Sequence, residues 1–141
     1  MTHTRREIVS GPMTVRVTLK EGRLSQVDFP NEIPDEFTSE HLRDVLAQLG
    51  RLELIFDQGT PFQQKTWSRM QKIPWGSALT YGQLASQIGS PRAVRAIGAA
   101  CGANPLPLIV PCHRVLAEDG IGGFSGGLHW KQKLLELESE G

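Results

Sequence analysis

The sequence contains few cysteines and few aromatic residues, has no net charge and lacks any long apolar run. Its 141 residues include 2 cysteines, and aromatic residues make up 6% of the chain. Two thiols cannot build a disulfide scaffold or a four-thiolate zinc site. No apolar stretch approaches the roughly 18 residues that cross a bilayer, and the first ten residues lack the apolar core of a secretory signal. We therefore expect a cytoplasmic protein with no membrane partner.

The neutral total hides an uneven distribution of charge. Residues 1–57 hold 7 Lys+Arg and 10 Asp+Glu, a difference of −3, whereas residues 58–141 hold 8 and 5, a difference of +3. The hydrophobic share of 39% and the charged share of 21% are those of an ordinary globular protein. The mild basicity of the second part fits an anionic partner, and it equally fits ordinary surface scatter.

The first part of the chain has the pattern of a small α/β unit. Residues 15–19 and 24–29 alternate between apolar and polar, with Glu21-Gly22 as a hairpin turn. Apolar residues from Leu42 to Leu49 then recur at helical spacing, and Gly50 is placed to end that helix. No nucleophilic cluster occurs here. Residues 1–57 are therefore predicted to be a small α/β N-terminal unit that serves packing.

Capping patterns mark the helices of the second part. Thr60-Pro61-Phe62-Gln63 and Thr80-Tyr81-Gly82-Gln83 each place a Gln three residues after a Thr, which is a helix start signal. After the turn Gly89-Ser90-Pro91, Ser90 is predicted to cap a third helix over residues 92–102. Two short helices joined in this way predict a helix-turn-helix. Residues 58–141 are thus predicted to be a mainly α domain, which makes the chain α+β overall.

The predicted third helix consists almost entirely of small residues. Its two arginines, Arg92 and Arg95, lie near its N-terminal end. Small side chains let a helix backbone come very close to its neighbour, and arginines with free backbone amides suit phosphates. A helix squeezed between neighbours in the core has the same composition. The sequence alone leaves both interpretations open.

Cys112 is the best nucleophile candidate in the chain. It follows a short apolar run over residues 108–110, which is expected to be strand-like, and a proline that disfavours helix. It precedes His113 and Arg114. Cationic neighbours favour the thiolate, the nucleophilic form of cysteine. Because side chains of consecutive residues diverge, His113 is expected to reach the thiol only through a bridging water. A buried structural thiol beside an unrelated histidine remains the alternative.

The run from Thr60 to Glu138 resembles the C-terminal domain of the O6-alkylguanine-DNA alkyltransferases, also called methylated-DNA–protein-cysteine methyltransferases. The hallmark is Ile109-Val110-Pro111-Cys112-His113-Arg114-Val115. Six supporting motifs occur in family order: Phe62-Gln63, Ile73-Pro74-Trp75-Gly76, Tyr81-Gly82-Gln83-Leu84-Ala85, Arg95-Ala96-Ile97-Gly98, Asn104-Pro105 and Phe124-Ser125-Gly126-Gly127-Leu128.

The resemblance implies DNA repair by irreversible, single-turnover transfer of an alkyl group, typically methyl, from O6-alkylguanine to a cysteine. Cys112 is then the acceptor. His113, polarised by Glu138 from a C-terminal helix, deprotonates it through a water. Tyr81 donates its hydroxyl to the guanine ring. No cofactor and no metal are implied.

The resemblance also implies double-stranded DNA containing O6-alkylguanine as the partner of a monomeric, cytoplasmic protein, nucleoid-associated if prokaryotic. Arg95 would enter the base stack as the damaged nucleotide is flipped out. The other implied DNA contacts are Ser90, Arg92 and Ala96, besides Tyr81. The implied base pocket is lined by Tyr81, Asn104, Val115, Phe124 and Ser125. Phe124 stands where relatives often have tyrosine, so any hydroxyl contact from this position is lost.

Three rival functions fit the sequence less well. The alkyltransferase-like class binds alkyl lesions without chemistry and carries a non-nucleophilic residue at the cysteine position, so Cys112 argues against it. A plain helix-turn-helix regulator leaves the cysteine, histidine and tyrosine pattern unexplained, and a thiol hydrolase needs a histidine that faces Cys112. Of the remaining notable residues, we assign Cys101 and the three tryptophans to packing, and Lys131 and Lys133 to a solvated face.

Overall fold

A computed structural model describes residues 3–141 of the chain. Its first part is an antiparallel sheet in the order β1 (His3–Ser10), β2 (Met13–Lys20) and β3 (Arg23–Asp28). The two strands predicted from alternation are β2 and β3. The prediction missed β1, which pairs with β2 along its whole length. This edge strand buries only Ile8 and Ser10, so its sequence carries little alternation.

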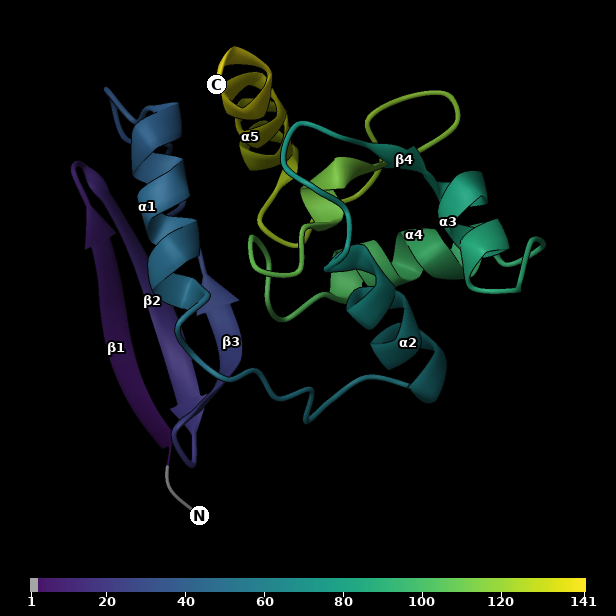
Figure 1. The fold of residues 1–141 in the computed structure, drawn as a ribbon, viewed down its shortest axis with the longest axis horizontal. Helices are drawn as coiled ribbons and strands as arrows, with labels where there is room; N and C mark the ends of the chain where they lie inside the picture. The colour runs from purple at the N-terminus through teal and green to yellow at the C-terminus, as the bar shows by residue number, and fades with distance from the viewer. Residues whose placement is uncertain (1–2) are drawn as a thin grey trace.

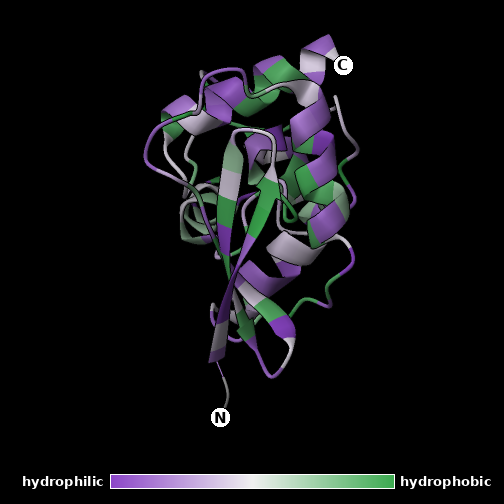
Figure 2. Cartoon of the chain, turned by 90° about the vertical axis from the view of Figure 1, so that its left-hand side faces the viewer, coloured by the Kyte–Doolittle hydropathy of each residue, from purple (hydrophilic) through white to green (hydrophobic). Residues whose placement is uncertain are grey.

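Helix α1 (Ser39–Leu49) covers one face of the sheet (Figure 1). Thr38 caps its N-terminus by accepting from the His41 amide, and Leu42, Val45 and Leu49 form its buried stripe, as predicted. Hydrophobic and hydrophilic stretches are interspersed along the strands and along α1 (Figure 2). The buried residues of β2 alternate with more exposed ones, which gives the sheet one packed face.

The second part consists mainly of helices. They are α2 (Pro61–Met70), α3 (Tyr81–Gln87), α4 (Val94–Ala103), the short 3-10 helix η1 (Cys112–Arg114) and α5 (Leu128–Glu140). Two short strands, β4 (Leu79–Thr80) and β5 (Val115–Leu116), pair in parallel. The predicted capping boxes at Thr60 and Thr80 are both formed, each closed by the glutamine three residues later. The α+β fold class is confirmed.

The start of α4 differs from the prediction. Its N-cap is Ala93, with no side-chain cap, so Ser90 does not cap this helix. The backbone of Ser90 instead donates to Ala85 at 2.9 Å, which closes the end of α3, and its carbonyl accepts from Ala93 at 2.9 Å. Residues 88–93 therefore form a longer connection between α3 and α4 than the predicted three-residue turn.

The segment before the candidate nucleophile also differs from the prediction. Residues 108–110 were expected to be strand-like, but only an isolated bridge between Pro107 and Val110 forms there, and Leu108 has a φ of 80°. Cys112 was expected in non-helical backbone, yet it begins η1. Proline at the N-cap explains this difference, because proline has no amide to lose at the start of a helix.

The two parts share one hydrophobic core, and Trp130 of α5 is central to their contact. Its ring lies 5.0 Å from the Phe29 ring and 5.9 Å from the Phe37 ring, centroid to centroid, and its indole donates to the Pro30 carbonyl at 2.8 Å. The backbone of Val27 donates to the Pro105 carbonyl at 2.8 Å. The N-terminal unit thus braces the turn between α4 and η1. Within residues 3–141, no helix is both long and apolar enough to cross a membrane.

Candidate active site

Cys112 is fully buried at the start of η1. The side-chain amide of Asn104, the residue that ends α4, donates to the Cys112 sulfur at 3.1 Å and to the Val110 carbonyl at 2.9 Å. The Asn104 side-chain oxygen accepts from the Leu106 backbone at 2.9 Å. One asparagine therefore fixes the turn after α4 and also contacts the thiol.

The thiol of Cys112 is protonated in this state. Burial raises its pKa to about 11, although the Asn104 hydrogen bond and the charge of Lys131 act in the opposite direction. The prediction that cationic neighbours favour a thiolate therefore needs correction. Arg114 directs its guanidinium to Glu138, and His113 is itself uncharged, so neither neighbour stabilises a resting thiolate. A base has to remove the proton during the reaction.

His113 and Glu138 form a buried pair. The ring Nε2 of His113 lies 2.5 Å from a carboxylate oxygen of Glu138, and both side chains are almost completely buried. Burial lowers the pKa of His113 and outweighs the opposing effect of Glu138, so the ring is neutral near pH 7. A neutral ring that donates from Nε2 accepts at Nδ1. This Nδ1 is buried and has no hydrogen-bond partner within residues 3–141.

Glu138 is held as a carboxylate by several donors. Besides His113, it accepts from Arg114 Nε at 2.9 Å, from Arg114 Nη2 at 2.8 Å and from the Gly76 backbone at 2.9 Å. Burial alone would raise the pKa of Glu138, but the hydrogen bonds from His113 and Arg114 outweigh burial and lower the pKa to about 2. Because Glu138 remains charged, it keeps the proton of His113 on Nε2.

Tyr81 is placed near the site by the pairing of β4 with β5, which sets Thr80 opposite Leu116. Its hydroxyl oxygen accepts from the Gly123 backbone at 2.7 Å, so its own hydrogen remains available for donation. A Cβ on Gly98 of α4 would lie 3.1 Å from the Tyr81 ring. The glycine therefore lets α4 pack directly against the tyrosine. Burial raises the pKa of Tyr81.

Lys131 lies in the core, which corrects its assignment to a solvated face. Its side chain is fully buried, and its ammonium donates to the Val115 carbonyl at 2.6 Å and to the Gly123 carbonyl at 3.0 Å. Burial lowers the pKa of Lys131. Its charge is one of the influences that lower the pKa of Cys112. Lys133 on the same helix is half-buried.

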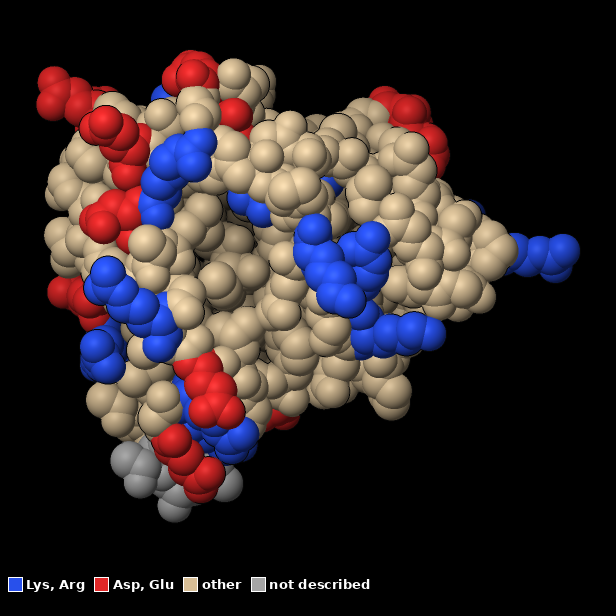
Figure 3. All heavy atoms as spheres, in the orientation of Figure 1, with Lys and Arg blue, Asp and Glu red and all other residues tan. Residues whose placement is uncertain are grey.

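A cavity of about 370 Å³ borders Asn104, the residue that contacts the Cys112 sulfur. Asn104, Pro107, Ser125 and Gly126 line it together with the end of β3. The face drawn in Figure 3 has a hollow between the N-terminal unit and the helical part. On this face basic side chains lie over α2 and at the tip of the connection between α3 and α4, where few acidic ones accompany them, whereas basic and acidic side chains are mixed over the N-terminal unit.

Comparison with known proteins identifies the family. Residues 61–140 match the family model described as 6-O-methylguanine DNA methyltransferase, DNA binding domain. The chain belongs to this methyltransferase family. It is 36% identical over 146 residues to a methylated-DNA–protein-cysteine methyltransferase of Haemophilus influenzae, a match that covers 90% of this chain and 82% of that protein.

Other relatives of this family member extend the comparison. A probable methylated-DNA–protein-cysteine methyltransferase of Acanthamoeba polyphaga mimivirus is 49% identical over 83 residues, which cover 59% of this chain but only 56% of that protein. The crystal structure of the O6-methylguanine methyltransferase of Mycobacterium tuberculosis superposes with a TM-score of 0.76 at 33% identity, covering 99% of this chain and 94% of that one. The resemblance inferred from the sequence motifs is confirmed.

The structure of this family member brings most of the predicted site residues together. Asn104 contacts Cys112, the adjacent His113 contacts Glu138, and the Phe124 ring lies 6.3 Å from the His113 ring, centroid to centroid. Val115 is buried next to them, and Ser125 borders the cavity beside Asn104. The predicted DNA contacts lie elsewhere, on α4 and the connection before it: Arg92, Arg95 and Ala96 are exposed and Ser90 is half-buried.

Two residues near the site escaped the sequence-based predictions. Arg114 was regarded as a neighbour of the thiol, but it pairs with Glu138 and donates to the Ile73 carbonyl at 2.7 Å. Lys131 was regarded as a surface residue. The sequence around Lys131 does indicate burial, because apolar residues at helical spacing form a buried helix face. These residues are Trp130, Leu134 and Leu137.

Proposed function

We propose that the protein repairs double-stranded DNA by transferring an alkyl group from O6 of guanine to Cys112, irreversibly and once per molecule. The observation that carries this proposal is the buried His113–Glu138 pair beside a buried cysteine. Relatives that are 36% and 51% identical over their matched residues are named methylated-DNA–protein-cysteine methyltransferases. The methyl group is the substituent that these names specify.

The geometry supports the following sequence of bond changes. His113 takes the Cys112 proton on its unpartnered Nδ1, through one water, while Glu138 stabilises the resulting imidazolium. The thiolate attacks the alkyl carbon, so a sulfur–carbon bond forms and the carbon–O6 bond breaks. The guanine leaves as an anion and takes up a proton, and the His113 imidazolium releases the proton that it accepted, so the thiol proton is balanced by the proton on the free guanine. Because the product is a thioether, which no group in the site cleaves, each molecule reacts once.

Base recognition is assigned to the residues around the thiol. Tyr81 keeps its hydroxyl hydrogen for the leaving guanine, since its oxygen already accepts from Gly123. Val115, Phe124 and Ser125 supply apolar and backbone contacts. Asn104 braces the turn that presents Cys112 and donates to its sulfur. A hydrogen bond to sulfur stabilises a thiolate more than a thiol, so this contact strengthens during the reaction.

DNA binding is assigned to α3 and α4 as a helix-turn-helix. The exposed Arg92, Arg95 and Ala96 of this region would contact the duplex together with Ser90, and Arg95 would fill the gap left by the flipped base. Flipping is required because an O6-alkyl group cannot reach a buried thiol from within the base stack. A relative from M. tuberculosis, with a TM-score of 0.75 and 33% identity, has been crystallised in complex with DNA.

The remaining assignments follow from the same function. Residues 58–141 are proposed to be the DNA-binding and alkyl-acceptor domain, and residues 1–57 a small unit packed against it. The protein is proposed to act as a monomer in the cytoplasm. The alternative function is lesion binding without chemistry, as in the alkyltransferase-like class. It is disfavoured because a nucleophilic residue, Cys112, stands at the acceptor position and His113, paired with Glu138, can act as its general base.

Intact-mass measurement after incubation with duplex DNA containing O6-methylguanine tests the proposal. We expect one CH₂ increment per protein molecule, located on the Cys112 peptide, with no further increment in excess substrate. Cys112→Ser should bind the lesion but gain no mass, and Cys101→Ser, which alters the other buried thiol, should still react. A wild-type protein that binds the lesion and gains no mass would establish the non-catalytic alternative.

A further inference from the structure

The turn that follows α2 contacts Glu138 directly and also contacts Arg114, the residue that pairs with Glu138. Its Gly76 backbone amide donates to the Glu138 carboxylate at 2.9 Å. Three residues earlier, its Ile73 carbonyl accepts from Arg114 at 2.7 Å. Arg114 in turn donates to Glu138. The position of this turn therefore determines how groups other than His113 compensate the charge of Glu138.

Ile73 at the start of the turn is buried, but the next four residues have few contacts that fix their position. Pro74, Gly76 and Ser77 are exposed, and Gly76 has a φ of 79°, a conformation that glycine adopts easily. The turn has one internal backbone hydrogen bond, from Ser77 to Pro74, at 3.1 Å. Its anchor toward the N-terminal unit is the half-buried Trp75.

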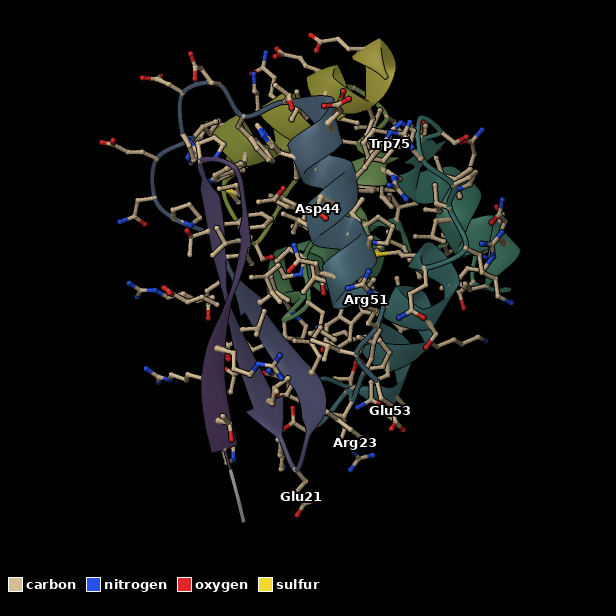
Figure 4. The ribbon with its side chains drawn as sticks, turned by 60° about the vertical axis from the view of Figure 1, so that its left-hand side comes forward. Glu21, Arg23, Asp44, Arg51, Glu53 and Trp75 are labelled. Carbon is tan, nitrogen blue, oxygen red and sulfur yellow. The ribbon has the colours of Figure 1, made fainter. Side chains whose placement is uncertain are left out.

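Arg43 of α1 covers Trp75. The centre of the Arg43 guanidinium lies 4.1 Å from the centroid of the Trp75 ring. Figure 4 shows Trp75 beside α1, whereas Arg51 lies beyond the other end of that helix. Arg43 also donates to the carbonyl of Gly141, which follows the end of α5, the helix that carries Glu138. One side chain of the N-terminal unit thus contacts both elements between which the Glu138 carboxylate lies.

We propose that Arg43 is a positioning residue for Glu138. It holds the Trp75 turn and the end of α5 in place, so that the Gly76 amide stays on the carboxylate and the carboxylate stays on His113. This role deepens the alkyl transfer proposed above, and it gives the N-terminal unit a part in the chemistry. An arginine can fill this role because its guanidinium is attracted to the face of the Trp75 ring, while its N–H groups can still donate to the Gly141 carbonyl.

Loosening the turn has a defined consequence. The groups that face Glu138 are His113, Arg114 and the Gly76 amide. When the amide is less firmly placed, the carboxylate is less well compensated, and the His113–Glu138 pair binds a proton more readily. The acid limb of the pH–rate profile should therefore move to higher pH. The transfer rate should fall about two- to fivefold, the range that corresponds to losing one exposed cation–π contact.

The full-length protein and four variants test this role: Arg43→Ala, Arg43→Lys, Trp75→Leu and the matched control Arg51→Ala. Arg51 is an exposed arginine just after α1, so its loss changes the charge equally without touching Trp75. Rates are measured against pH for methyl transfer from duplex DNA. They are also measured for alkylation of Cys112 by iodoacetamide, resolved from Cys101 by peptide mapping.

We expect Arg43→Ala and Trp75→Leu to shift the acid limb upward in both reactions, Arg43→Lys to restore part of the loss, and Arg51→Ala to match the wild type. Urea unfolding checks that each variant is folded. If Arg43→Ala lowers only the urea midpoint and leaves both profiles unchanged, Arg43 merely joins the two parts and the inference is wrong. Should Arg43→Ala fail to fold, an unshifted Trp75→Leu overturns it equally. If the wild type transfers no methyl group, but the variants still shift the pH profile of Cys112 alkylation by iodoacetamide, the proposed function is refuted and the role of Arg43 is not.

Discussion

The side-chain amide of Asn104 donates to the sulfur of Cys112 at 3.1 Å, although the two residues are eight positions apart in the sequence. The same amide donates to the Val110 carbonyl, so it links the turn after α4 to the segment that enters η1. The side-chain oxygen of Asn104 accepts from the Leu106 backbone, so both the oxygen and the nitrogen of this side chain are hydrogen-bonded inside the core. This arrangement couples the shape of the turn to the ionisation of the thiol.

Replacing Asn104 should slow the transfer. Asn104→Ala removes the only side-chain donor to the Cys112 sulfur within residues 3–141. A hydrogen bond to a charged group contributes about 1.5–3 kcal/mol, so the second-order rate of methyl transfer should fall about ten- to a hundredfold. Rapid-quench kinetics with a methylated duplex measures this rate. An unchanged rate in a folded Asn104→Ala protein would show that the contact has no part in thiolate formation.

Removing the buried charge of Lys131 should hinder thiolate formation. Lys131→Met keeps an unbranched chain in the core but removes the cation that helps to lower the pKa of Cys112. We expect the pKa of the Cys112 thiol, followed by thiolate absorbance, to rise further above its present value of about 11. The transfer rate at neutral pH should fall. Lys133→Met, on the same helix, makes the same charge change outside the core and should leave both quantities unchanged.

Glu138 should make folding stability depend on acid pH. Its pKa in the folded protein, about 2, is lower than the ordinary value of 4.5 for a glutamate side chain, so the folded state favours the charged carboxylate. This stabilisation is fully present above pH 4.5 and is lost as the pH falls from there toward 2. The difference in free energy of unfolding between the wild type and Glu138→Gln should therefore shrink over this window. Urea denaturation at a series of pH values measures it, and a constant difference would contradict the assignment.

Arg95 should matter for duplex DNA and not for a free base. If its side chain fills the gap left by the flipped nucleotide, Arg95→Ala should slow transfer from a methylated duplex, where unstacking costs a few kcal/mol. Free O6-benzylguanine needs no flipping, so its reaction with Cys112 should keep the wild-type rate. His113→Ala should slow both substrates alike. Equal slowing of both substrates by Arg95→Ala would mean that Arg95 supports the fold of the site.

The local elements were predictable because their signals lie within a few residues. Thr60 and Thr80 cap the helices that follow them, and the alternating residues of β2 and β3 form strands, since each pattern depends on neighbours in sequence. Ser90 is the instructive exception. It has the residue type of a cap, but its backbone closes α3, a choice made by the packing of two helices.

The sequence by itself determined the family and the candidate chemistry, because the motif around Cys112 is contiguous and the supporting motifs follow in order. Only the tertiary structure decided the electrostatics of the site. The partner of Arg114 is 24 residues away, Lys131 is buried against carbonyls 8 and 16 residues away, and Arg43 reaches Trp75 from another part of the chain. Charges inside a protein are set by burial and by the groups that surround them in space. Neither can be read from residue order, so the neutral thiol of Cys112 and the charged carboxylate of Glu138 emerge only in the folded molecule.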